Sequence, residues 1–310
     1  LKSESFSPVG LNLYDSDKDA EFSFELNGEY IDYGAGKTIV NAKIDNLLFC
    51  SDGDTTLVRN FYVSDNNAGD DRIFMVTSDF ASASIYGDFD FKRIKSSLAG
   101  ILKSHLPVLD ITSESDSSPS FLNDFYYDVA ITNTIPLTKM LNLPLTVLEP
   151  SSIKGVFNER ENIFNVDGLI NKIDLNGGLI RSLNVNGKSG HGGLDLNVQL
   201  TKPLSRKIKN FDYNNQAEDI VVRINANVES DKIRGIVNWN NFKTDDVMMG
   251  MVRMDAELGR SAKRELELVA RIHEDSIIHK NRVWHVNEGT VSGRIDRLLV
   301  ENIGLYSEGQ

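Results

Sequence analysis

Two stretches carry the Gly-Lys-hydroxyl ending of a phosphate-binding loop: GAGKT at residues 34–38 and GKS at residues 187–189. The full pattern also needs a glycine five positions before the second glycine, where Ile31 and Ser182 stand. A helix must follow, because its N-terminus meets the phosphate, yet strand-like sequence follows both stretches. We therefore expect a hairpin turn at each place and no nucleotide site.

An acidic stretch, DSDKD, resembles the start of a calcium-binding loop through Asp15, Asp17 and Asp19. Such a loop needs glycine at its sixth position and a bidentate glutamate at its twelfth, where this chain has Ala20 and Leu26. We expect a solvated acidic turn, with an opportunistic calcium contact as the alternative.

The remaining residues that could bind a metal or act as nucleophiles are the five histidines and the single Cys50. The histidines are His105, His191, His273, His279 and His285. None lies in an HExxH arrangement, and one cysteine builds neither a thiolate zinc site nor an intramolecular disulfide. SGHGG lacks the spacing of a nucleophile elbow, because His191 stands where glycine is needed. The sequence therefore predicts a non-enzymatic protein with no metal and no cofactor.

The charge balance excludes one class of partner. The 310 residues include 33 Lys plus Arg against 45 Asp plus Glu, a net charge of −12. A protein that neutralises a nucleic-acid backbone carries the opposite balance, so we expect no nucleic acid as a partner.

The chain begins with Leu and has no run of about 18 apolar residues. We expect a fragment or processed form, with any signal or anchor outside it.

Most of the chain alternates apolar and polar residues with a period of two, as half-buried strands do. A series of such rows predicts an all-β fold in which consecutive strands are antiparallel neighbours. The apolar residues expected to line the inner face are Phe22, Phe24, Leu26, Ile173, Leu175, Leu194, Leu196, Val198, Val222, Ile224, Leu266, Leu268 and Trp284. Two facing sheets, closure into barrels, or a sheet curled into a groove would each cover this face.

The period changes to about 3.6 in one place only. Ile94, Leu98, Ile101, Leu102, His105 and Leu106 fall on one face of a helix predicted over residues 91–106. Asp90 is placed to cap its start, and Pro107 ends it. The helix either plugs the end or side of a β core, or its basic face contacts an anionic membrane or covers an apolar groove.

These patterns suggest three parts. Residues 1–109 are strands that end in the helix, residues 110–124 are a Ser-rich linker, and residues 125–310 are continuous β repeats.

Two segments carry a family resemblance: GDFDFKRIKSSLAGILKSHLPVL, from Gly87, and HKNRVWHVNEGTVSGRIDRLLVENIGLYSEGQ, from His279. Both resemble recurring segments of TamB-like proteins (translocation and assembly module, AsmA-like) of the Bacteroidetes type. The resemblance implies an internal fragment of a periplasmic protein whose inner-membrane anchor lies outside this sequence. It also implies a long, strongly curved antiparallel sheet that forms a U-shaped groove, or β-taco, apolar inside and polar outside.

The resemblance further implies phospholipid transport to the outer membrane and outer-membrane biogenesis. The implied partners are phospholipid acyl chains and an outer-membrane barrel protein of the TamA or BamA type. Two alternatives stay open: a scaffold or chaperone for assembly of outer-membrane β-barrel proteins, and a surface β-sandwich adhesin or carbohydrate-binding module.

Overall fold

The computed structural model describes residues 2–6, 20–51, 54–109, 122–141, 143–190, 192–203, 219–260, 265–294 and 297–307. Its strands form one large, open, mostly antiparallel sheet, which confirms the all-β prediction. The expected acidic turn at Asp15, Asp17 and Asp19 lies outside the described residues, as do residues 110–121 of the expected linker.

The chain divides into two compact units. The first unit contains Leu1–Phe89, Asp124–Val156 and Gly168–Leu179, and the second unit contains Asp90–Asn123, Phe157–Asp167 and Ile180–Gln310.

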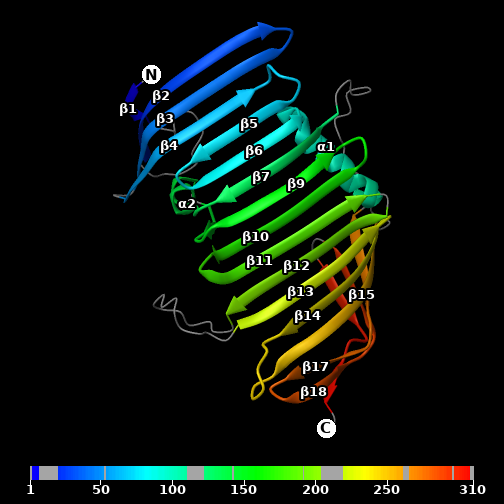
Figure 1. Ribbon diagram of the computed structural model, residues 1–310. Helices are drawn as coiled ribbons and strands as arrows, with labels where there is room; N and C mark the ends of the chain where they lie inside the picture. The colour runs from blue at the N-terminus through cyan, green and yellow to red at the C-terminus, as the bar shows by residue number, and fades with distance from the viewer. Residues whose placement is uncertain are drawn as a thin grey trace. The chain divides into compact units, whose positions relative to one another are not determined.

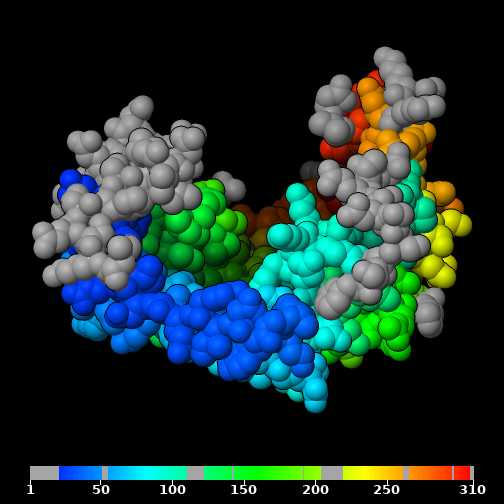
Figure 2. Space-filling view, turned by 90° about the horizontal axis from the view of Figure 1, so that it is seen from above, coloured from blue at the N-terminus to red at the C-terminus, as the bar shows by residue number. Residues whose placement is uncertain are grey.

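The first unit is a meander in which each strand pairs antiparallel with the next (Figure 1). Its main strands are β2 (Ala20–Gly34), β3 (Lys37–Ser51), β4 (Asp54–Asn66), β5 (Arg72–Ser78), β6 (Ala81–Asp88) and β7 (Asp124–Ile131). Shorter or shared elements are β1 (Lys2–Phe6), α2 (Ile135–Leu141), β8 (Leu145–Val147), β9 (Ser151–Asn158) and β10 (Ile163–Leu175). Seen from above, β2 and β3 (blue) form a continuous near surface of this unit (Figure 2). The helix α2 is an addition to the single helix that the sequence predicts.

The two phosphate-loop look-alikes have different outcomes. Gly34 and Gly36, with φ of 79° and 77°, form the tight turn between β2 and β3, so this hairpin prediction is confirmed. The turn predicted at residues 187–189 is wrong, because these residues lie inside β11 (Gly178–Gly190). A Cβ on Gly187 would stand 2.9 Å from the Val166 side chain. This glycine therefore makes room for a neighbouring side chain and forms no turn.

The second unit continues as a regular meander. After β11 come β12 (Gly193–Pro203), β13 (Asp219–Glu229), β14 (Lys232–Asn240) and β15 (Met248–Arg260), each paired antiparallel with the one before. Six shorter strands follow: β16 (Leu266–Ile272), β17 (Asp275–His279), β18 (Arg282–Val286), β19 (Gly289–Arg294), β20 (Arg297–Glu301) and β21 (Leu305–Ser307).

A crease crosses the last part of this unit. Both β16 and β17 pair with β15, so together they form one long strand with a break. In the same way, β18 pairs with β17 and β19 pairs with β16, so β18 and β19 form the next long strand with a break. Between the pairs Met254↔Ile272 and Gly250↔Ile277, three residues of β15 oppose four residues of the partner strand. The extra residue returns Ile277 to the face that Ile272 occupies, as a β-bulge does.

The predicted helix is confirmed as α1 (Phe91–His105), followed by the 3₁₀ turn η2 (Pro107–Leu109). The Asp90 carboxylate accepts a hydrogen bond from the Lys92 amide at 3.0 Å, so Asp90 is the N-cap. Within the part of the chain that the structure describes, neither helix is both long and apolar enough to span a membrane.

Candidate functional site

Four rows of apolar side chains cross one face of the second unit, each row passing from strand to strand. The first row is Leu194, Val228, Ile233, Ala256, Ala270 and Val291. The second is Leu196, Ala226, Gly235, Met254 and Ile272, and the third is Val185, Val198, Ile224, Val237 and Val252. The fourth is Leu183, Leu200, Val222, Trp239, Gly250, Ile277 and Trp284. No charged residue interrupts these rows, which we call the apolar face.

The apolar face is half-buried, which is unusual for so large an apolar surface. Leu196, Val198, Ile224 and Val237 all keep intermediate exposure. Apart from α1 and η2, every described element of this unit is a strand of the same sheet. A facing layer would bury such side chains fully, and none of the described elements of this unit supplies one over the middle rows.

Glycines shape the floor of this face. A Cβ on Gly250 would stand 2.5 Å from the Trp239 ring and 2.6 Å from Ile277. A Cβ on Gly235 would stand 2.9 Å from the end of the Met254 side chain. These side chains therefore lie flat over backbone, and the flexible thioether leaves the surface adaptable.

The helix α1 is fixed along the strand ends of the second unit. At its start, buried Asn123 accepts a hydrogen bond from the Asp90 amide at 2.8 Å and donates one to the Ser97 hydroxyl at 2.8 Å. At its end, the Asp231 amide donates to the His105 carbonyl at 3.1 Å. The next bond runs from the Val108 amide to the Asp231 carboxylate at 2.9 Å.

The length of α1 matches this course. Its 15 residues span about 22 Å, and strands lie about 4.8 Å apart, so it passes the ends of four to five strands. Ile101 is 2% exposed, whereas Phe91 is 44% exposed. Val228, Ala256 and Ala270 of the first row, nearest this rim, are buried. The C-terminal end of the helix therefore lies at the turn between β13 and β14, next to the first row.

His105 is a buried titratable residue at this end of the apolar face. It is 6% exposed, and its Nε2 has no hydrogen-bond partner among the described residues. Because burial disfavours the charged imidazolium, the pKa of His105 is lowered from its ordinary value. Burial therefore opposes a positive charge on this side chain.

The first unit has an apolar face of its own. Leu26, Ile44 and Phe61 form one row, and Gly28, Ala42, Val63, Val76, Ala83 and Val129 form the next. Asn46, at φ 53°, is the extra residue that keeps Ile44 and Phe49 on the same side of β3.

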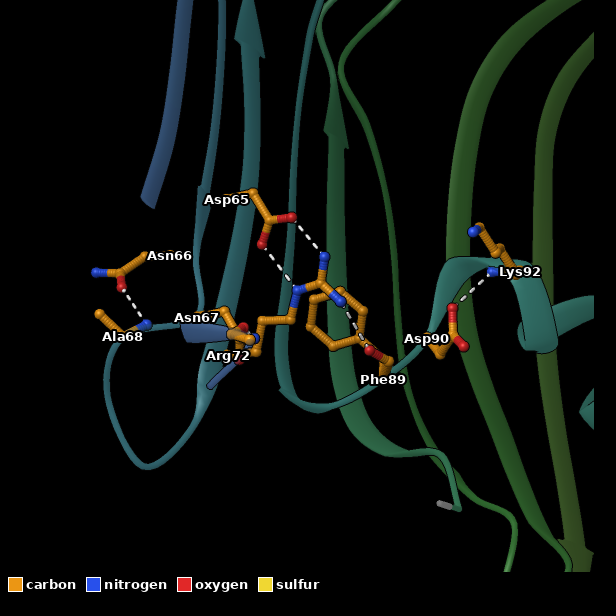
Figure 3. A network of polar contacts seen from close by, with 9 residues as sticks. Asp65, Asn66, Asn67, Ala68, Arg72, Phe89, Asp90 and Lys92 are labelled. Carbon is orange, nitrogen blue, oxygen red and sulfur yellow. Dashed lines mark hydrogen bonds and ion pairs between the residues drawn. The ribbon is translucent and has the colours of Figure 1, made fainter. Parts of the chain in front are cut away.

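One ion pair lies on this face of the first unit (Figure 3). Arg72 Nε and Nη2 donate to the two carboxylate oxygens of Asp65 at 2.8 and 2.5 Å. Its Nη1 donates to the Phe89 carbonyl at 2.9 Å, and its guanidinium lies 4.6 Å from the centre of the Phe89 ring. The charge is therefore held in a bidentate, stacked geometry.

The predicted lining residues separate into two groups. Leu194, Leu196, Val198, Val222, Ile224 and Trp284 lie in the four rows of the apolar face, and Leu266 and Leu268 lie beyond the first row on the same side of β16. Phe22, Phe24 and Leu26 alternate along β2, where Phe22 packs on Phe49 with ring centres 4.9 Å apart. Ile173 and Leu175 lie on β10 opposite Val147 and Leu145 of β8, the first 2% and the second 45% exposed.

The list of predicted lining residues missed much of the face. Val237, Trp239, Val252 and Met254 occupy its centre and follow the same alternation. The signal was present, but only the register of β13, β14 and β15 shows that these residues are central.

Among the described residues, no group of three or more His, Cys, Asp or Glu could hold a metal ion. Comparison with protein-family models, with curated proteins and with solved structures finds no match.

Proposed function

We propose that the apolar face of the second unit binds phospholipid acyl chains, and that this chain is a segment of a TamB-like lipid-transfer conduit in the bacterial cell envelope. The observation that supports this proposal is the set of four apolar rows without a charged residue, whose middle rows stay half-buried. The proposal includes the U-shaped groove, a periplasmic location and an inner-membrane anchor outside this sequence.

Physical chemistry makes such a face suitable for transport. An acyl chain gains about 0.8 kcal/mol for each CH₂ removed from water, so binding strengthens with the length of chain that the face covers and stays reversible. Neighbouring rows offer nearly equivalent apolar environments, so a chain moves between them across small barriers. The headgroup stays hydrated at the open side of the sheet and needs no dedicated pocket.

Lipid retention by the purified protein tests this proposal. We expect native mass spectrometry and solvent extraction to find phospholipid bound to the wild-type chain. Ile224→Asp places a charge in the third row and should remove most of that lipid, because a buried carboxylate next to acyl chains is costly. The matched control is Asn225→Asp. Asn225 is the next residue of β13 after Ile224, so its side chain lies on the opposite face of the sheet.

Circular dichroism of both variants shows whether the sheet still forms. A wild-type chain that carries no lipid after mild purification would contradict the proposal. Equal lipid retention by Ile224→Asp and Asn225→Asp would contradict it as well.

A second candidate function is a scaffold that receives strands of outer-membrane barrel proteins. It is favoured by β20, whose five residues are all exposed, with Leu298 at 70% and Val300 at 53%. Among the described strands β20 pairs with β19 alone, so one edge is open to strand addition. A photocrosslinker at Leu299 should capture an unfolded barrel protein under this function, and lipid or nothing under the first.

A further inference from the structure

A polar trough lies on the face opposite the apolar rows of the second unit. It is a hollow of about 700 Å³ whose walls are two neighbouring rows of side chains that cross the strands. One wall is Asn186, Asn197, Asn225, Ile236 and Arg253, and the other is Lys188, Asp195, Asn227, Arg234 and Asp255. His273 closes one end.

The trough offers donors and acceptors in regular order. Amide side chains, each with a donor and an acceptor group, recur from strand to strand about 4.8 Å apart. A sugar chain likewise presents new hydroxyl groups at each unit. The volume lies within the range of about 300–1,000 Å³ in which proteins bind small ligands.

The charged side chains of the trough differ in whether they have partners. Asp195 accepts a hydrogen bond from the Asn227 amide at 2.9 Å, and Asp255 contacts His273 at 2.7 Å. Arg253 contacts Asp275 at 3.2 Å. Lys188 and Arg234 have no side-chain partner within the residues that the structure describes. Two cations in the trough are therefore available to acceptors from outside.

We propose that this trough binds an acidic oligosaccharide. The amide rows would hydrogen-bond the sugar hydroxyls, and Arg234 and Lys188 would each pair with a carboxylate of the sugar. The trough has no aromatic platform among its lining residues, so specificity would come from hydrogen bonds and charge. This site lies on the opposite face from the acyl-chain site and is independent of the proposed function.

Calorimetric titration of the full chain with tetragalacturonate tests the proposal. We expect saturable binding that weakens as salt is added, because screening reduces charge pairing. Arg234→Gln and Lys188→Gln should each raise the Kd about tenfold, the scale of one lost charge-assisted hydrogen bond. Arg282→Gln and Lys154→Gln are matched controls at exposed positions outside the trough and should leave the Kd unchanged.

The fully methyl-esterified tetramer is a second control that needs no variant. It keeps the hydroxyl groups and lacks the charge, so it should bind at least tenfold more weakly than the free acid. Absence of tetragalacturonate binding would overturn the proposal. Equal binding of the ester, or an equal loss in Arg282→Gln, would overturn it too.

Discussion

Replacing Arg72 by Met tests how the first unit tolerates charge on its apolar face. The change removes two bonds to Asp65, one bond to the Phe89 carbonyl and the contact with the Phe89 ring. Charge-assisted bonds contribute about 1.5–3 kcal/mol when buried, and exposed pairs about 0.2–1 kcal/mol. The Arg72 and Asp65 side chains are 23% and 20% exposed, between these limits. We therefore expect Arg72→Met to lower the free energy of unfolding by about 2 kcal/mol.

The partner variant separates pairing from simple truncation. Asp65→Leu alone should cost about 1–2 kcal/mol, since Arg72 keeps its contacts with Phe89. The double variant should cost about 1 kcal/mol or less, because two apolar side chains replace a desolvated pair. The cycle thus predicts a coupling energy of at least about 2 kcal/mol.

Urea unfolding followed by far-UV circular dichroism measures these costs, and amide hydrogen exchange in β4 and β5 assigns them to the first unit. Lys43→Met is the matched control, because its pair with Asp45 is more exposed, at 51% and 23%. It should change the unfolding free energy by less than about 0.5 kcal/mol. Additive single-variant costs, with no coupling, would show that Arg72 and Asp65 do not stabilise the first unit as a pair.

Three further predictions concern the second unit. Gly250→Val should destabilise this unit by about 1–3 kcal/mol and shift Trp239 emission. The control Gly293→Ala should do neither, because its Cβ would meet only Leu298, at 3.6 Å. An unshifted Trp239 spectrum in Gly250→Val would contradict the packing of Trp239 over Gly250. Gly100→Ala should raise the melting temperature, with a gain of about 0.5–1 kcal/mol, because nothing lies within 4 Å of the new methyl group; a loss of stability would show that α1 packs differently. The pKa of His105 is lowered in the folded protein, so its contribution to the stability of α1 is fully present above the unfolded pKa of about 6.5. This contribution is lost as pH falls from about 6.5 toward the folded pKa. Hydrogen exchange of α1 should therefore accelerate over that range in the wild type and not in His105→Gln.

The sequence predicted local structure well wherever one period persisted. Alternation identified the strands, and the spacing from Ile94 to Leu106 with the Asp90 cap identified α1. The tight turn at Gly34 followed from local chemistry as well.

Features that depend on register were beyond the sequence. The bulge between Ile272 and Ile277 and the extra residue at Asn46 move side chains to the other face, which a simple odd-even count cannot anticipate. Gly187 looked like a turn residue, but the space it leaves is filled by Val166 from another strand. The polar trough was missed for the same reason, because Lys188 and Arg234 become neighbours of one hollow only after β11 to β14 pair.

Tryptophan quenching by brominated phospholipid tests whether acyl chains occupy the apolar face. The two tryptophans, Trp239 and Trp284, both lie in the fourth row of the apolar face. Bromine placed on the acyl chain should quench both Trp284→Phe and Trp239→Phe single-tryptophan proteins, and an unbrominated lipid should quench neither. If neither tryptophan is quenched at lipid concentrations that saturate binding, acyl chains do not occupy this face and the account is contradicted.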